Sequence, residues 1–337
     1  MMNCNKFWLF FLAVLTLSTP FCLQADSTST KRTDRYPGSI TDIKGILVGT
    51  SEDTIGKTGC TAVLLDKLYT GGVDVRGGGP GTLNTDVLSP YTGTGVVDCI
   101  MLSGGSAFGL GCATGAMNWL EEQDRGFETG LKRVPMVNAA IIYDLEIGDC
   151  NARPTAAMGY AACKNAGSVV KEGPWGGGYA ATVGTLNGFE GMEASGQGTS
   201  CIDLGNGILV GAIVVVNAGG DVYDGDTRMA GAHHTDGTPQ NTLEYVLDGA
   251  QAKGFGTNTT IGVVATNLKL DRGMTTKLAM IAHDGYAMAI RPVHTLSDGD
   301  TVYSVSTGEI DRPDEINRVL AAAAEAMRRA IVNAVRK

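Results

Sequence analysis

The sequence has few of the features that mark nucleic-acid-binding or zinc-binding proteins. Charged residues make up only 18% of the 337 residues, and the formal net charge is −9. A thinly charged, acidic chain is a poor match for nucleic acid or for an anionic membrane surface, so we expect neither as a partner. There are only four histidines, and no two cysteines have Cys-x-x-Cys spacing. The sequence therefore predicts no structural zinc site.

The sequence also lacks a hydrophobic run long enough to span a membrane. Residues 7–17 are almost wholly apolar, but a run of about 11 residues falls short of the roughly 20 that a bilayer requires. Leu-Gln-Ala at residues 23–25 offers a small residue to a signal peptidase. Cys22 could mark a lipoprotein anchor, but the residues before it lack the small side chains such a site usually requires. We expect residues 1–25 to be a cleaved signal peptide and the protein to be secreted or periplasmic, with no membrane contact after signal removal.

Six cysteines remain after the expected signal peptide, and their state is open. An exported protein can pair its cysteines. Cys60, Cys99 and Cys112, however, lie in apolar or glycine-rich runs, where a free cysteine behaves as a small core residue. The sequence does not assign a pairing. The six are Cys60, Cys99, Cys112, Cys150, Cys163 and Cys201.

Glycine is the abundant residue, with 48 of 337 positions, about twice the usual share of roughly 7%. The glycines cluster where apolar runs end, which favours many short strands joined by tight turns. No repeat and no long linker divides the chain, so we expect a single domain over residues 26–337. The predicted strands are 59–66, 71–76, 96–103, 138–144, 207–217, 259–267 and 300–307. The predicted helices are 106–123, 154–166, 240–252, 275–290 and 312–335.

A glycine-rich turn follows the strand that ends near residue 103. Gly104, Gly105 and Ser106 lie where a strand leads into a helix, and backbone N–H groups at such a turn can bind an oxyanion or a carboxylate. We therefore treat these residues as candidates for substrate binding, with a packing turn as the alternative. A serine nucleophile is poorly supported because the Gly-x-Ser-x-Gly spacing is absent.

Two further segments carry charges in suggestive positions. Asp74 and Arg76 flank a glycine turn, so they could bind a substrate terminus or form an internal ion pair. Asp298 and Asp300 would share one face of an extended segment and could then hold a cation, a metal or an ammonium group. The alternative is a solvated turn. The neighbouring His294 is more typical of a core or loop-bonded histidine than of a ligand.

The junction between Asn258 and Thr259 joins a glycine-rich loop to a β-branched strand. If that peptide bond breaks, Thr259 carries a nucleophilic hydroxyl and a free amine together. An α-amine has a pKa near 7.7–8.0, against about 10.4 for lysine, so an N-terminal threonine needs no separate base. The alternative is N-glycosylation, because Asn258-Thr259-Thr260 is also a sequon. A glycan requires a surface loop, however, and a strand of buried type begins two residues later.

These segments, taken in order, resemble the L-aminopeptidase/D-esterase family of N-terminal nucleophile hydrolases, which includes the nylon-oligomer endo-hydrolases. The resemblance covers nearly the whole chain after the signal peptide. The matching motifs are Ile40-Thr41-Asp42-Ile43 with Val48-Gly49, Val73 to Thr82, Leu102 to Leu110, Ile142-Tyr143-Asp144-Leu145 with Gly148-Asp149, Ala181-Thr182-Val183-Gly184, Val210 to Asp221, Asn258 to Thr266, His283-Asp284-Gly285, and Ile290 through His294-Thr295 to Asp298-Gly299-Asp300.

The resemblance implies an α+β fold, a four-layer αββα sandwich. It implies self-cleavage between Asn258 and Thr259 into pieces 26–258 and 259–337. It also implies an aminopeptidase or amidase that hydrolyses small N-terminal peptide, amide or ester bonds, with no metal and no organic cofactor. The family further suggests a homo-oligomer of processed heterodimers.

The same resemblance implies a role for each matching site residue. Thr259 would be the nucleophile and its amine the general base. Asn217 would donate a hydrogen bond to the oxyanion, and Tyr143 would hydrogen-bond within the site. Asp298 and Asp300 would hold the hydroxyl and the amine of Thr259.

One position departs from the family pattern. Nylon-hydrolase-like members carry Ala-Thr-Val-Gly-Lys, whereas this chain has Thr185 in the place of the lysine. Thr185 remains a candidate for substrate binding but cannot supply a positive charge. Two alternatives therefore stay open: an acyltransferase of the ornithine acetyltransferase type, and a catalytically impaired binding protein.

Overall fold

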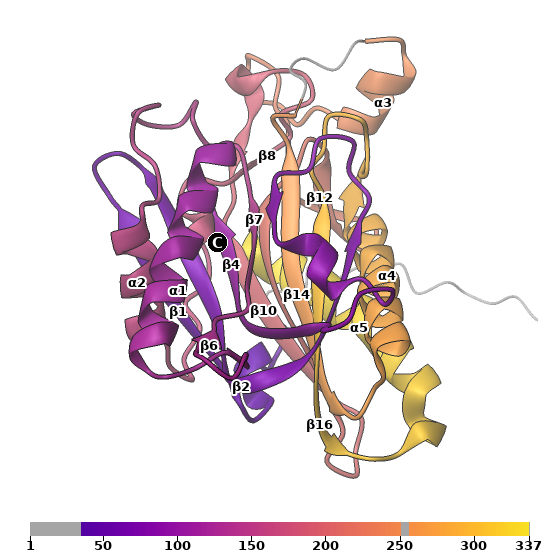
Figure 1. The fold of residues 1–337 in the computed structure, drawn as a ribbon. Helices are drawn as coiled ribbons and strands as arrows, with labels where there is room; N and C mark the ends of the chain where they lie inside the picture. Colours follow the sequence, from indigo (N-terminus) through magenta and orange to yellow (C-terminus); the bar gives the residue numbers. More distant parts are fainter. Residues whose placement is uncertain (1–34, 251–255, 337) are drawn as a thin grey trace, which may run out of the picture. The chain divides into compact units, whose positions relative to one another are not determined.

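The computed structural model describes residues 35–250 and 256–336 (Figure 1). The expected signal peptide, residues 1–25, lies outside the described residues. The main sheet has nine strands: β10-β11-β14-β16-β2-β4-β7-β3 in order, with β1 paired to β2. These strands are β1 (Ile46–Asp53), β2 (Thr58–Val75), β3 (Thr82–Leu83), β4 (Val96–Ser103), β7 (Val137–Ile141), β10 (Gln197–Asp203), β11 (Leu209–Asn217), β14 (Thr259–Leu268) and β16 (Thr301–Ile310).

Shorter strands form three small sheets, and the described residues also contain five α-helices and six short 3-10 helices. The small-sheet strands are β5 (Phe127–Glu128) with β6 (Arg133–Val134), β8 (Thr182–Val183) with β9 (Glu193–Ala194), and β12 (Asp221–Asp224) between β13 (Thr227–Ala230) and β15 (Ile290–Arg291). The helices are α1 (Cys112–Glu122), α2 (Ala156–Lys164), α3 (Thr242–Leu247), α4 (Arg272–Ala289) and α5 (Ile316–Ala334). No helix in the described ranges is both long and apolar enough to cross a bilayer.

The long strand β2 joins two halves of the main sheet. Its first part pairs with β1 and β4, and its last residues, 70–75, pair with β16. The pairing with β4 shifts register between Leu64 and Tyr69, where the strand changes course. One half therefore contains β10, β11, β14 and β16, and the other contains β1, β4, β7 and β3.

Three separate hydrophobic clusters show that the two halves are stacked between helices. Val264 of β14 packs with Met327 of α5 in the first cluster. Its neighbour Val263 belongs to a second cluster with Ile100 of β4, because successive strand residues face opposite sides. Met101 of β4 belongs to the third cluster, which joins that half of the sheet to α1 and α2. Figure 1 shows α1 and α2 on one side of the strands and α4 and α5 on the other. The predicted four-layer αββα sandwich is confirmed.

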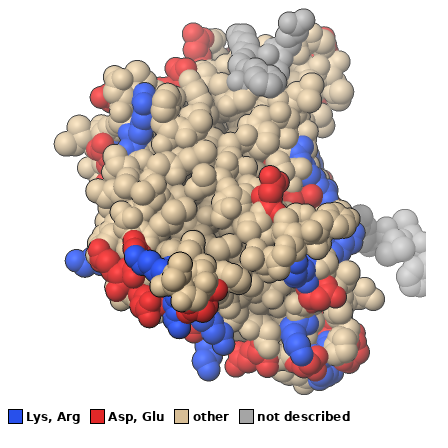
Figure 2. All heavy atoms as spheres, viewed as in Figure 1, with Lys and Arg blue, Asp and Glu red and all other residues tan. Residues whose placement is uncertain are grey.

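The six cysteines of the described chain carry free thiols. Cys150 is exposed and the other five are buried. Cys60, Cys99 and Cys112 lie in the cluster beneath α1 and α2, as expected of small core residues. On the face drawn in Figure 2 the charged side chains gather mainly along the lower part of the view, and the centre is largely uncharged.

Candidate active site

Thr259 is the first residue of β14 and lies directly opposite Asn217, the last residue of β11. It is 2% exposed. Ile261 and Val263, two and four residues further along, face the cluster between the two halves of the sheet. Side chains alternate along a strand, so the Thr259 hydroxyl faces the same inner side.

The carbonyl group before Thr259 has two hydrogen-bond donors. The Gly299 N–H donates to the Asn258 carbonyl oxygen at 2.8 Å, and the Thr259 hydroxyl donates to the same oxygen. Any side chain at position 299 would collide with that hydroxyl, since a Cβ there would lie 2.6 Å from Thr259 Oγ1. The hydroxyl of Thr259, the predicted nucleophile, is thus adjacent to the carbonyl that it would attack. A main-chain donor is already in place for the negative charge that would develop on the oxygen.

The Asn258 side chain is held by the residue that departs from the family pattern. Thr185 donates its hydroxyl hydrogen bond to Asn258 Oδ1, and both residues are buried. Thr185 therefore contacts the residue immediately before the expected cleavage. Because Asn258 has no exposed surface in the folded chain, the glycosylation alternative has no room for a glycan.

Asn217 uses its whole side-chain amide in the uncleaved chain. Its Oδ1 accepts from the Thr182 N–H at 3.0 Å, and its Nδ2 donates to the carbonyls of Tyr143 at 3.1 Å and Thr257 at 3.3 Å. Thr257 lies two residues before the expected cleavage and in the same piece as Asn217, so only a movement of the new chain end at Asn258 would free this N–H beside Thr259. The oxyanion role of Asn217 stays a prediction that this geometry can accommodate.

Tyr143 enters this network through its main chain. Its carbonyl accepts from Asn217, whereas its hydroxyl donates to Glu146 Oε1 at 3.0 Å. A role for the Tyr143 hydroxyl at the nucleophile stays a prediction.

The two predicted carboxylates are both buried beside the junction. Asp300 Oδ1 accepts from the Thr260 N–H at 2.7 Å, and Asp298 Oδ2 accepts from the Thr295 N–H at 2.6 Å. Burial raises the pKa of Asp298 to about 7, with the neighbouring Asp300 as the second cause of the rise. Asp298 also forms a parallel bridge with Asn258. The solvated-turn alternative is therefore wrong, although neither carboxylate is hydrogen-bonded to the Thr259 hydroxyl before cleavage.

The glycine turn at residues 77–79 clamps this acidic segment. The Gly79 N–H donates to the Asp298 carbonyl at 2.8 Å, and the Gly77 N–H donates to the Asp300 carbonyl at 3.3 Å. A Cβ on Gly77 would lie 2.3 Å from the Asp298 carbonyl oxygen, so only glycine allows this approach. The charges that flank the turn form an internal ion pair, with Arg76 Nε 2.8 Å from Asp74 Oδ2.

The second glycine turn is fastened to a carboxylate that the sequence did not single out. The Gly105 N–H donates to Asp144 Oδ1 at 2.6 Å, and the Thr58 hydroxyl donates to Asp144 Oδ2 at 2.7 Å. Burial raises the pKa of Asp144, and these two hydrogen bonds oppose the rise. Gly104 and Ser106 belong to the same turn. The hydrogen bond from Gly105 to Asp144 holds this turn close to Tyr143, the residue before Asp144. The turn is a packing feature at least, and its part in substrate binding stays a prediction.

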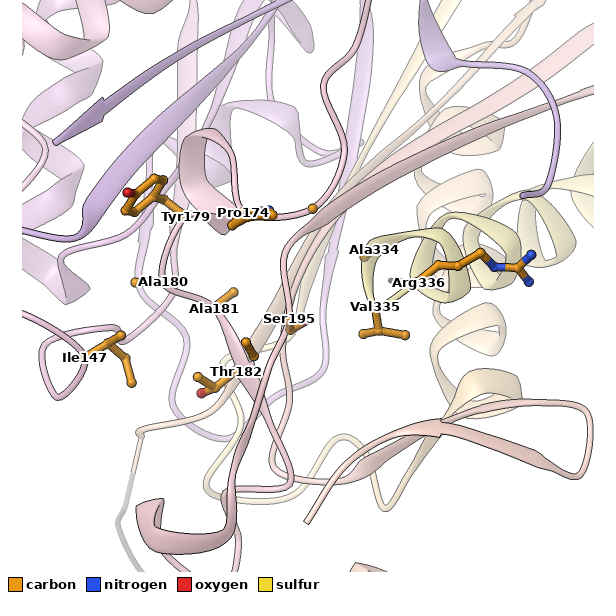
Figure 3. A pocket seen from close by; sticks show the side chains of 12 residues that line it. Ile147, Pro174, Tyr179, Ala180, Ala181, Thr182, Ser195, Ala334, Val335 and Arg336 are labelled. Atoms are coloured by element: carbon orange, nitrogen blue, oxygen red, sulfur yellow. The ribbon is translucent and has the colours of Figure 1, made fainter. Parts of the chain in front are cut away.

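An apolar cavity of about 280 Å³ adjoins the Asn217 network. Thr182, whose N–H donates to Asn217, lines this cavity together with Ile147, Ser195 and Val335 (Figure 3). Small side chains at many of the remaining lining positions leave the space open. Among the residues that the structure describes, no group of three or more His, Cys, Asp or Glu side chains is placed to hold a metal ion.

Comparison with known proteins supports the same family. The profile of peptidase family S58 matches residues 38–337. An uncharacterised aminopeptidase of Mycobacterium bovis is 39% identical over 327 residues, covering 88% of this chain and 93% of that protein. A 6-aminohexanoate-oligomer endohydrolase of a Kocuria species is 30% identical, covering 81% of this chain and 76% of that protein.

Solved structures share the fold at lower sequence identity. The L-aminopeptidase D-Ala-esterase/amidase of Ochrobactrum anthropi, described as a variant of the Ntn hydrolase fold, superposes with a TM-score of 0.67 at 22% identity. That match covers 89% of this chain and 86% of the other. A β-aminopeptidase of a Burkholderia species gives a TM-score of 0.64 at 23% identity, over 89% and 88% of the two chains. The chain therefore belongs to peptidase family S58, the L-aminopeptidase/D-esterase family, and is a hydrolase of the aminopeptidase/amidase type with the N-terminal nucleophile hydrolase fold.

Proposed function

We propose that the protein is an exported, self-processing aminopeptidase/amidase whose nucleophile is Thr259. One observation carries the proposal: the buried Thr259 hydroxyl lies against the carbonyl of Asn258, and that carbonyl also accepts from the Gly299 N–H. Two buried carboxylates lie close by, with Asp300 hydrogen-bonded to the N–H of Thr260 and Asp298 in a backbone bridge with Asn258.

Self-cleavage then follows as an intramolecular acyl shift. Thr259 Oγ1 attacks the carbonyl carbon of Asn258, and the Gly299 N–H stabilises the oxyanion. The C–N bond breaks, the proton lost by the hydroxyl passes to the leaving nitrogen, and the acyl group is left as an ester on Oγ1. Water hydrolyses the ester, which gives Asn258 a carboxylate and restores the hydroxyl. Asp298, which forms a backbone bridge with Asn258 and whose pKa burial raises to about 7, is our candidate for relaying the proton.

The same atoms would then serve turnover of substrate. The new α-amine of Thr259 has an ordinary pKa near 7.7–8.0 and takes the hydroxyl proton as general base. Asp298 and Asp300 orient that amine, although carboxylates beside an ammonium group raise its pKa and so reduce its readiness to release a proton and act as a base. Asn217, released from Thr257 by movement of the new chain end, supplies an oxyanion donor.

The substrates that fit this chemistry are small peptides, amides and esters with an accessible N-terminal bond. A relative is named for hydrolysing 6-aminohexanoate oligomers and a structural neighbour for peptidase, esterase and amidase action. We further propose that processed heterodimers assemble into a homo-oligomer and that the protein acts outside the cytoplasm.

Intact mass and N-terminal sequencing of the purified protein test the proposal. The wild type should give one piece beginning after residue 25 and one beginning at Thr259. The variant Thr259→Ala should remain whole, and Thr259→Ser should still split because it keeps a hydroxyl. If the wild type stays whole and Thr259→Ala leaves its hydrolytic activity unchanged, the proposal is wrong. Offering the split enzyme an amino acid acceptor beside water separates hydrolysis from acyl transfer.

A further inference from the structure

His294 is held in an unusual backbone conformation beside the acidic segment. Its φ is +59°, in the left-handed region that residues with a side chain rarely adopt. Two hydrogen bonds to one atom accompany this conformation: both the His294 N–H, at 3.1 Å, and Nδ1, at 2.7 Å, contact Asp300 Oδ2. Strained backbone of this kind persists where surrounding contacts over-determine it, and it is concentrated at functional sites.

The imidazole ring is fixed from its other side by aromatic neighbours. The ring of His283, which is fully buried, meets the His294 ring edge-on with centroids 4.8 Å apart. The Tyr286 ring stacks on it at 5.9 Å. His283 in turn is anchored by Nε2, 3.0 Å from the Asp74 carbonyl oxygen. The His294 ring therefore has little freedom to leave Asp300.

The other carboxylate oxygen of Asp300 contacts the start of the strand that begins with Thr259. Oδ1 accepts from the N–H of Thr260, the residue that follows Thr259, at 2.7 Å. The main chain of Asp300 is fixed as well, because its carbonyl accepts from the Arg76 N–H at 3.0 Å. The rotation of the carboxylate about its Cβ–Cγ bond is therefore fixed from both ends, by the Thr260 N–H on Oδ1 and by the N–H and Nδ1 of His294 on Oδ2.

We propose that His294 is a positioning residue that holds the Asp300 carboxylate in the orientation required by Thr259, both in self-cleavage and in turnover. The inference rests on the proposed function, because it assigns His294 a task only if Thr259 is the nucleophile. His294 does not touch the reacting atoms and acts through Asp300.

The geometry also defines which atom of the imidazole matters. Asp300 Oδ2 already accepts from the His294 N–H, so we assign the hydrogen of the Oδ2–Nδ1 contact to Nδ1; the buried Nε2 has no hydrogen-bond partner in the part of the chain that the structure describes. A donor at the Nδ1 position is therefore sufficient. Asparagine carries an amide nitrogen the same number of bonds from Cα and tolerates positive φ, whereas glutamine places its amide at the position of Nε2.

Four variants of the full-length protein test the inference: His294→Asn, His294→Gln, His294→Gly and, as a matched control, the exposed His234→Asn. The readouts are the rate at which the chain splits, and kcat and KM of the split enzyme with an amino acid p-nitroanilide. We expect His294→Asn and His234→Asn to stay within a few-fold of wild type. His294→Gln and His294→Gly should lose roughly 10- to 100-fold in splitting rate and in kcat, with little change in KM.

Glycine separates the two features of the site, since it keeps the positive φ and removes the side-chain donor. Wild-type rates in His294→Gly, or equal rates in His294→Asn and His294→Gln, would overturn the inference. Thermal unfolding of each variant is measured in parallel. If the losses in splitting rate and kcat scale with the fall in Tm and not with removal of the side-chain donor, the inference is also overturned. A wild-type chain that neither splits nor hydrolyses the probe would instead remove the proposed function, and the role of His294 with it.

Discussion

The raised pKa of Asp298 predicts how the stability of the uncleaved chain changes with pH. Burial, and secondly the charge of Asp300, raise this pKa from its ordinary 3.8 to about 7 in the folded protein. Between these values the folded chain binds a proton that the unfolded chain has released. The contribution of Asp298 to stability is therefore fully present below about pH 4 and is lost as the pH rises through 7.

The size of the effect follows from the shift. Each pKa unit corresponds to about 1.4 kcal/mol, so a shift of about three units corresponds to up to about 4 kcal/mol. Sharing of protons with Asp300 spreads the change over a wider pH range and makes this figure an upper value. Asp298→Asn removes the titration and keeps an oxygen that can accept from the Thr295 N–H, now 2.6 Å from Asp298 Oδ2.

The comparison requires chains that cannot split, so both proteins carry Thr259→Ala. Urea unfolding of Thr259→Ala and of Thr259→Ala/Asp298→Asn is measured from pH 4 to pH 8. We expect the free energy of unfolding of the double variant, minus that of its parent, to increase as the pH rises. The increase from pH 4 to pH 8 should be about 1–4 kcal/mol. Parallel curves, or a difference that grows in favour of the parent, would refute the assignment of a raised pKa to this side chain.

Three further substitutions have outcomes that the structure fixes. Burial lowers the pKa of His283 to about 4, so its contribution to stability is present above about pH 6.5 and lost on acidification. Between neutral and acidic pH, His283→Gln should therefore lose less stability than its parent. An equal loss in the two proteins would contradict this. Thr185→Val removes the hydroxyl that holds Asn258, so on a denaturing-gel time course it should split more slowly than Thr185→Ser; equal rates would count against the contact. Asn217→Ala, assayed after splitting, should lose roughly 10²–10³ in kcat, and an unchanged kcat would exclude it as the oxyanion donor.

The strands best predicted from sequence are those buried on both faces. The prediction 96–103 matches β4, and 259–267 differs from β14 by one residue. Layers on both sides of these strands require continuous runs of apolar and β-branched residues, which are easy to recognise. The strands β1 and β10 were not predicted. Each pairs with a single neighbour at the edge of the sheet and is rich in polar residues and glycine, so neither shows such a run.

Other differences arise from contacts between distant parts of the chain. The predicted strands 59–66 and 71–76 are one strand, β2, because both halves of the sheet continue the pairing through its bend. The predicted strand 138–144 ends at Ile141, since Tyr143 and Asp144 leave the ladder for Asn217 and the 104–105 turn. Of the predicted helix 240–252, the structure describes a helix over Thr242–Leu247, and residues 251–252 lie outside the described residues.

The residues of the candidate site also fall into those that could be predicted from sequence and those that could not. The junction at Thr259 could be found from sequence because its chemistry resides in one residue and its strand is evident. The clamp of Gly77 on the acidic segment could not, because the partners are more than 200 residues apart and glycine turns are common in this chain. Asp144 and the hydrogen bonds of His294 to Asp300 were missed for a similar reason: a buried polar residue is recognised by its partners, and only the folded chain supplies them.

In the proposed mechanism the uncleaved chain occupies its own active site, and this suggests what Thr185 contributes in place of a lysine. In that mechanism Asn258 is the first acyl group attached to Thr259, and its side chain is held by the Thr185 hydroxyl. A substrate acyl group that replaces Asn258 on the nucleophile places its own side chain beside the same hydroxyl. A neutral donor and acceptor there favours acyl groups with a hydrogen-bonding side chain, whereas a lysine would favour an anionic one. We therefore expect the ratio of kcat/KM for an asparaginyl over a leucyl p-nitroanilide to fall in Thr185→Val and to persist in Thr185→Ser. An unchanged ratio in Thr185→Val would show that the substrate side chain lies elsewhere, with the apolar cavity beside Thr182 as the place to examine.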